Sequence, residues 1–227
     1  MNPRKPATAD KGPRQPVSPR LKVRTLTAVA QWWPENEERY DCLDLSSVHV
    51  PGVELYGVEV RGSRLTSVFL DGAGIEASML VDCRLDDCSL ANVRAHESSM
   101  IRVAVARSRL TGISWSAGGI RDVTFEGCKM NLAGFRMQKF STVVFVDCDL
   151  RDSDFQGADL RGARFERCDL TNVEFSNADL TGAWFQDCSF ERLRGAMAMK
   201  GATIGGNDLI SLSPAMASAI GITVREG

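Results

Sequence analysis

The sequence has little of what enzymes use. Its 227 residues include only two histidines, His49 and His96, and no dinucleotide fingerprint, phosphate-cradling glycine loop or metal-ligand spacing. Carboxylates are plentiful, but they recur at regular intervals, which is typical of solvated ladders and not of a buried pair with separated pKa values. We therefore predict that the protein is not an enzyme and has no catalytic residues, no metal and no cofactor.

Long apolar runs are missing as well. No apolar stretch reaches the roughly 18 residues that a membrane-spanning helix needs. The amino terminus lacks the apolar core of a signal peptide. We therefore expect a cytoplasmic protein that does not bind membranes.

What the sequence does have is a period of five residues. All thirty positions at multiples of five from Leu45 to Phe190 are apolar. The residue two places earlier is usually small, and the residue two places later is often glycine or polar, as Ala158 and Gly162 are around Leu160. Strand side chains alternate, so the first two positions share an inner face, while the third favours a turn. The pattern predicts a short strand and a corner in every five residues.

Like residues also recur every 20 positions, which indicates four sides to each coil. Three columns show it: Phe125, Phe145, Phe165 and Phe185; Phe135, Phe155 and Phe175; and Cys88, Cys128, Cys148, Cys168 and Cys188, with Ser108 in the gap. Six of the seven cysteines lie at the small inner position, and only Cys42 does not. A single column does not converge on a tetrahedral metal centre, and parallel side chains in a cytoplasmic protein disfavour disulfides. We predict stacked structural thiols.

Three stretches, residues 158–162, 163–167 and 178–182, resemble the A(D/N)LxX consensus of the pentapeptide-repeat family. The resemblance covers about residues 41–193 and implies an all-β fold, a right-handed quadrilateral β-helix. About seven and a half coils are expected, with short capping segments and a carboxy-terminal helix. Function stays open, because the family hosts many roles.

The ends of the chain depart from the repeat. We expect a flexible, basic, proline-rich tail at 1–24, an amino-terminal cap at 25–40, and an irregular last coil, helix and cap or dimerisation segment at 194–227. A shifted inner set of Met199, Ile204 and Leu209 is expected in the last coil. Ser213 and Pro214 form a helix start signal, and Gly221 forms a stop signal.

The outward positions carry charge in three bands. Counting Asp and Glu against Lys and Arg gives 9 against 3 in residues 41–93, 3 against 8 in 94–139, and 11 against 5 in 140–193. The candidate acidic interaction surface in the last band comprises Asp149, Asp154, Asp159, Asp169, Glu174 and Asp179. Resemblance to the fluoroquinolone-resistance members suggests a DNA mimic that binds DNA gyrase or another topoisomerase and confers drug resistance. The basic middle band interrupts such an array, and direct nucleic-acid binding by the acidic rod is not expected.

Apolar residues at outward positions support a different hypothesis, a protein-interaction scaffold with an unknown partner. The candidate apolar contact surface comprises Met79, Val81 and Ile101 on one side and Val144, Val146 and Trp184 on another. The alternative is that they are scattered surface residues or lie under the amino-terminal segment. We favour the scaffold over topoisomerase mimicry.

The carboxy-terminal segment ends in apolar residues that one subunit need not cover. The candidate contacts are Met216, Ile220, Ile222 and Val224, as a cap or as a homodimer interface. In proteins similar to the fluoroquinolone-resistance members, dimers form through this segment, so both alternatives stay open.

Overall fold

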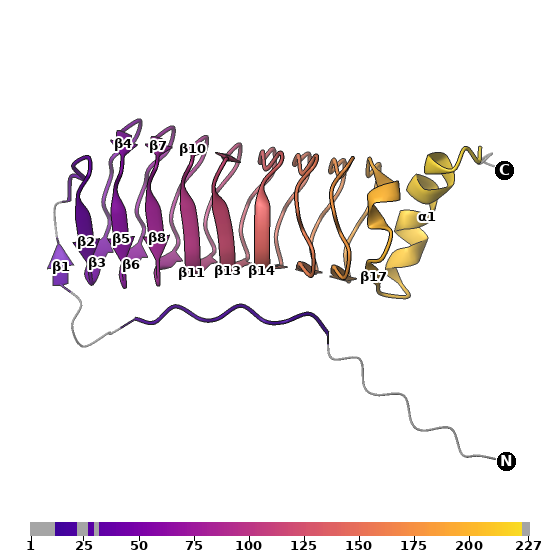
Figure 1. The fold of residues 1–227 in the computed structure, drawn as a ribbon, viewed down its shortest axis with the longest axis horizontal. Coiled ribbons are helices and arrows are strands. Elements are labelled where there is room, and N and C mark those ends of the chain that lie inside the picture. Colours follow the sequence, from indigo (N-terminus) through magenta and orange to yellow (C-terminus); the bar gives the residue numbers. More distant parts are fainter. Residues whose placement is uncertain (1–11, 22–26, 30–31, 224–227) are drawn as a thin grey trace, which may run out of the picture.

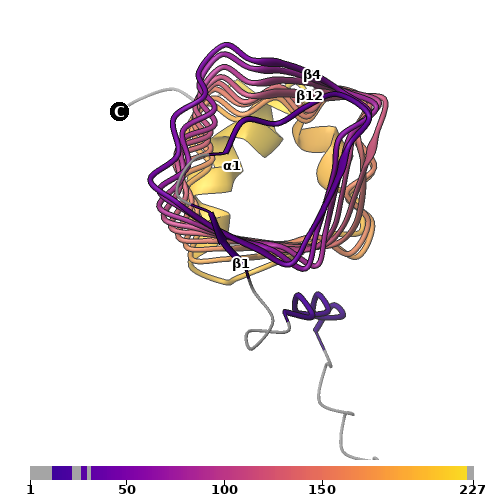
Figure 2. The ribbon, with the colours of Figure 1, turned by 90° about the vertical axis from the view of Figure 1, so that its left-hand side faces the viewer.

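In the computed structural model, which describes residues 12–21, 27–29 and 32–223, the chain turns a corner after every fifth residue (Figures 1 and 2). Each corner residue from Cys42 to Arg192 has a left-handed φ, between 49° at Arg107 and 73° at Gly72. Glycine adopts this conformation without a steric penalty, and the other residue types adopt it at a cost. The predicted corner position is therefore confirmed.

Short parallel strands form the sides between the corners. They are β1 (Thr27–Val29), β2 (Arg39–Asp41), β3 (Leu43–Ser46), β4 (Glu54–Tyr56), β5 (Glu59–Arg61), β6 (Arg64–Thr66), β7 (Gly74–Glu76), β8 (Met79–Val81), β9 (Arg84–Asp86), β10 (Arg94–His96), β11 (Ser99–Ala106), β12 (Ser114–Ser116), β13 (Gly119–Glu126), β14 (Lys139–Val146), β15 (Arg164–Glu166), β16 (Trp184–Gln186) and β17 (Thr203–Ile204). The three eight-residue strands β11, β13 and β14 continue around a corner.

Partners in the sheets are mostly 20 residues apart, as in Phe125↔Phe145 and Phe145↔Phe165. One stack runs β1-β3-β6-β9-β11-β13-β14-β15-β16-β17, and a second runs β12-β10-β7-β4. The predicted right-handed quadrilateral β-helix is confirmed. It extends beyond the expected bounds, because β1 pairs with β3 before residue 41 and β17 pairs with β16 after residue 193.

The core is the column of inner residues, with large side chains in its carboxy-terminal half. Leu160 and Phe165, which test the predicted register, are both 0% exposed. Phenylalanine rings stack from coil to coil at centroid distances of 5.2 Å for Phe125 and Phe145 and 4.9 Å for Phe145 and Phe165. The amino-terminal half has smaller inner residues and leaves an apolar cavity of about 60 Å³ beside Trp32 and Leu80.

A helical cap covers the carboxy-terminal end of the β-helix (Figure 1). It consists of the 3-10 helix η2 (Ala196–Met199), β17 and the helix α1 (Asp208–Ala219). The helix begins at Asp208, six residues before the predicted first helical position at Pro214, and Pro214 lies inside it. Proline leaves the Ile210 carbonyl without its helical N–H donor, and the Ser213 hydroxyl donates to that carbonyl instead, at 2.9 Å. Leu209, expected inside, is 57% exposed.

Candidate protein-interaction surfaces

The six carboxylates of the candidate acidic surface lie on three different sides of the β-helix. They form three neighbouring pairs in adjacent coils: Asp149 with Asp169, Asp154 with Glu174, and Asp159 with Asp179. The sides are successive five-residue segments separated by corners. No single side therefore displays all six charges together.

An arginine lies close to every one of these carboxylates. Arg151 contacts Asp149 at 2.7 Å and Asp169 at 3.7 Å, and Arg161 contacts Asp159 at 2.6 Å and Asp179 at 3.6 Å. The remaining two pairs are Arg136 with Asp154 at 3.1 Å and Arg194 with Glu174 at 3.3 Å. The acidic surface is thus compensated by cations.

These contacts also set the titration of the carboxylates. A hydrogen bond from Arg151 holds the pKa of Asp149 below its usual range, and Arg161 does the same for the pKa of Asp159. Both acids stay ionised at neutral pH and keep their arginine partners. The arginine side chains are more than half exposed to solvent, at 52% for Arg151 and 64% for Arg161, so each pair contributes little to stability.

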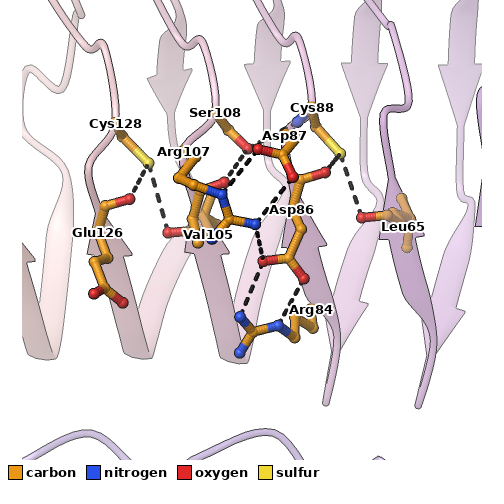
Figure 3. Close-up of polar contacts among 11 residues, drawn as sticks. Leu65, Arg84, Asp86, Asp87, Cys88, Val105, Arg107, Ser108, Glu126 and Cys128 are labelled. Atoms are coloured by element: carbon orange, nitrogen blue, oxygen red, sulfur yellow. Dashed lines mark hydrogen bonds and ion pairs between the residues drawn. The ribbon is translucent and has the colours of Figure 1, made fainter.

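The basic middle band is joined to the acidic first band in the same way. The Arg107 guanidinium contacts Asp87 at 2.9 Å and Asp86 at 3.2 Å, and Arg84 contacts Asp86 at 2.6 Å (Figure 3). Arg102 forms two hydrogen bonds to Asp82, at 2.7 and 2.6 Å. Arginines of the basic middle band therefore form ion pairs with aspartates of the acidic first band in the neighbouring coil.

The candidate apolar residues flank one corner of the β-helix. Met79, Val81 and Ile101 lie on the side before this corner, in strands β8 and β11, and the second set lies on the side after it, in β14 and β16. Val81 is 6% exposed and Val144 is 4% exposed, although both project outward. The members that are half-buried are Met79, Ile101, Val146 and Trp184.

Residues 12–21, which the composition assigns to a flexible tail, lie extended along this corner (Figure 1). The Arg20 N–H donates to Asp82 Oδ1 at 3.1 Å, and the Val17 N–H donates to Asp122 Oδ1 at 3.4 Å. At the far end, Gly12 packs against the Trp184 ring so closely that an added Cβ would lie 2.3 Å from a ring carbon. The segment thus covers part of the candidate apolar surface.

The carboxy-terminal contact residues are exposed. Met216 is 38% exposed, Ile220 is 62% exposed and Ile222 is 56% exposed, while Val224 lies outside the described residues. Ile210, which the sequence did not single out, is 79% exposed. Leu212 and Asp208 hold the helix against the last coil and are buried.

The inner thiols are free and face backbone carbonyls. Within the described ranges all seven cysteines are unpaired, and no group of His, Cys, Asp or Glu side chains could hold a metal ion. The thiol of Cys88 donates to the carbonyls of Asp86 and Leu65, and Cys128 repeats the contact two coils later (Figure 3). Burial raises the pKa of Cys88 to about 11, which disfavours a reactive thiolate.

The two histidines both lie on the surface of the β-helix. His49 is exposed and stacks on Phe69 at 4.1 Å between ring centroids, and His96 is exposed and contacts Ser116 Oγ at 3.1 Å. Among residues 12–21, 27–29 and 32–223, no helix has the length and apolarity to cross a membrane.

Comparison with known proteins points to the same repeat. A family model described as "Pentapeptide repeat region" matches residues 98–175 and 118–194. Full-length QnrB1, a plasmid-mediated fluoroquinolone resistance protein, is similar over 87% of this chain and 100% of that chain, with 15% identity and a TM-score of 0.44. HetL, a pentapeptide repeat protein involved in heterocyst differentiation regulation in the cyanobacterium Nostoc sp., is similar over 74% of this chain and 89% of that chain, with 17% identity and a TM-score of 0.28. At these values neither likeness bears on function. No curated protein matches the sequence.

Proposed function

Because the chain belongs to the pentapeptide-repeat family, we propose that it is a non-enzymatic scaffold that binds other proteins and pairs with a second copy of itself through its carboxy-terminal cap. The strongest support is the exposure of large apolar side chains along α1 and directly after it. Ile210 and Ile220 are 79% and 62% exposed, and Leu209 and Ile222 add further apolar surface. Grouped exposed apolar side chains are typical of contact surfaces.

A rigid framework suits this role. The inner columns are packed from coil to coil, so outward side chains keep fixed positions relative to one another. The cavity between Trp32 and Leu80 lies inside the β-helix, and its lining is mostly apolar. Recognition therefore falls to outer side chains.

DNA mimicry of a topoisomerase is the weaker alternative. A DNA duplex carries one negative charge per ~1.7 Å of its axis, with no built-in cations. Here the carboxylates are divided among three sides, and each has an arginine within 3.7 Å. Both features weaken the negative potential that a mimic needs.

A binding titration with purified DNA gyrase separates the two roles. Gyrase is immobilised and the full-length chain is added at about 50 mM and about 200 mM salt, since screening weakens contacts between exposed charges. The scaffold role predicts no gyrase binding at either salt concentration. Salt-sensitive binding that is lost on changing Asp154, Asp159 and Asp179 to Asn and Glu174 to Gln would overturn it.

A matched control removes the same number of charges from corners. Asp87, Asp147, Asp152 and Asp187 all have left-handed φ values, a conformation that Asn tolerates. If gyrase binds the candidate acidic surface, changing these four corner residues to Asn should leave that binding in place. Loss of binding in both variants would indicate a net-charge effect only.

A further inference from the structure

The segment of residues 12–21 has the features of a polyproline II helix. Pro13, Pro16 and Pro19 are three residues apart, and three residues make one turn of this helix. All three prolines are half-buried, whereas Gln15 and Ser18 are exposed. The prolines therefore share the side that faces the β-helix. Viewed along the axis of the β-helix, the segment is a tight spiral outside the square coils (Figure 2).

The spacing of its anchors matches the repeat of the β-helix. Val17 and Arg20, whose amides are bonded to Asp122 and Asp82, are three residues apart. Three residues of polyproline II span about 9.3 Å. The two aspartates occupy the same corner two coils apart, which is about 9.6 Å at ~4.8 Å per coil. The amides of Val17 and Arg20 thus match two corners that are two coils apart.

The match continues to the far end of the segment. Gly12 and Val17 are separated by five residues, or about 15.5 Å of polyproline II. The contacts of these residues, Trp184 and Asp122, lie three coils apart, or about 14.4 Å. Arg164 lies over the Trp184 ring at 5.5 Å and helps to hold it in place. The corner therefore provides two carboxylates at one end and an aromatic ring at the other.

Two outward-projecting valines lie near these anchors. Val144 stands between Asp122 and Trp184 in the stack, through the pairs Val144↔Arg164 and Arg164↔Trp184. It is 4% exposed although it projects outward, and Val81 beside Asp82 is 6% exposed. Apolar side chains next to the corner suit proline rings, while the amides that follow Pro16 and Pro19 supply the polar contacts.

We propose that this corner, from Asp82 to Trp184, is a docking surface for proline-rich peptides with proline at every third position, and that residues 12–21 occupy it in cis. The partner it fits is an extended segment of another protein with the same spacing of prolines. Such a segment enters by displacing the chain's own. This docking surface lies on the side of the β-helix and does not depend on pairing through the cap.

The test uses full-length protein and a labelled synthetic peptide of residues 12–21, with fluorescence anisotropy as the readout. In the wild-type chain the tethered segment competes at high effective concentration, so the peptide should bind weakly. A variant with Pro13→Gly, Pro16→Gly and Pro19→Gly keeps the docking surface but loses the preformed helix of its own segment. It should bind the peptide at least about tenfold more tightly than wild type.

Two controls test whether the peptide binds at this docking surface. Adding Asp122→Gly to the proline variant removes an acceptor at a corner with φ 54°, which glycine favours, and should weaken peptide binding about tenfold. Asp152→Gly makes the same change at a corner with φ 58° in another column and should have no effect. Failure of the proline variant to bind the peptide, or equal binding of a scrambled peptide, overturns the proposal. A dimer mass that the glycine substitutions abolish would indicate exchange of the segment between copies and would overturn occupancy in cis.

Discussion

The rings of Phe165 and Phe185 lie 4.8 Å apart between centroids, and their planes are within 3° of each other. The two residues are 20 positions apart and are direct partners in the parallel sheet. The same relationship joins Phe145 to Phe165 at 4.9 Å. Stacked rings fill the carboxy-terminal half of the β-helix, so this half has the densest core.

Truncating one ring in this column should destabilise the protein strongly. Phe165 is 0% exposed, and rigid neighbours on both sides cannot close the space that it leaves. We expect Phe165→Ala to lower the free energy of unfolding by about 3–5 kcal/mol. Chemical denaturation measures it, with Phe69→Ala as the control, because Phe69 projects outward onto His49 and should cost less than about 1 kcal/mol. Equal losses at the two sites would contradict the burial of Phe165.

Adding a glycine at one corner and removing a glycine from another should change the free energy of unfolding in opposite directions. Leu132 has φ 62° and is 59% exposed, so Leu132→Gly relieves the left-handed backbone and loses little burial. We expect a gain of about 1 kcal/mol in unfolding free energy. Gly72 occupies the same corner three coils earlier with φ 73°, and an added Cβ would meet nothing within 4 Å. Gly72→Ala should therefore lose about 1 kcal/mol through the backbone alone. Calorimetry should show melting temperatures shifted in opposite senses.

Alkaline pH should weaken the fold through the buried thiols. Burial raises the pKa of Cys83 and Cys88 to about 11, against about 8.5–9 in the unfolded chain. At a pH between these two pKa values, the thiols ionise in the unfolded chain but stay protonated in the folded protein. The free energy of unfolding therefore falls as the pH rises from about 9 to about 11. The loss should approach about 2 kcal/mol for each thiol. Cys83→Ala with Cys88→Ala should flatten this part of the profile. An unchanged slope in the double variant would contradict the assignment.

The inner register and the corners could be predicted from sequence because both repeat. Phe165 faces inward for the same reason as the other members of its series, and Gly162 marks the corner beside it. The pairing of the acidic side chains with arginines was harder to predict from the sequence. Arg151 and Arg161 each lie two residues after their aspartates, on the same side of the strand, and this D-x-R spacing was the available signal.

The ends were less predictable because local signals competed there. Ser213 and Pro214 form a good helix start, yet packing of Leu212 on the last coil and the Ser213 hydroxyl bond let the helix begin at Asp208. The placement of residues 12–21 could not follow from composition, because a proline-rich segment has no hydrogen bonds of its own. The spacing of Pro13, Pro16 and Pro19 was the one clue to its conformation.

The mass of the full-length protein in solution tests the proposed pairing through the cap most directly. Light scattering at micromolar concentration should give twice the chain mass of 24.8 kDa. Ile210→Asp with Ile220→Asp places charges on the exposed side of the cap, and this variant should have the mass of one chain with an unchanged melting temperature. A wild-type mass of 24.8 kDa would contradict the account.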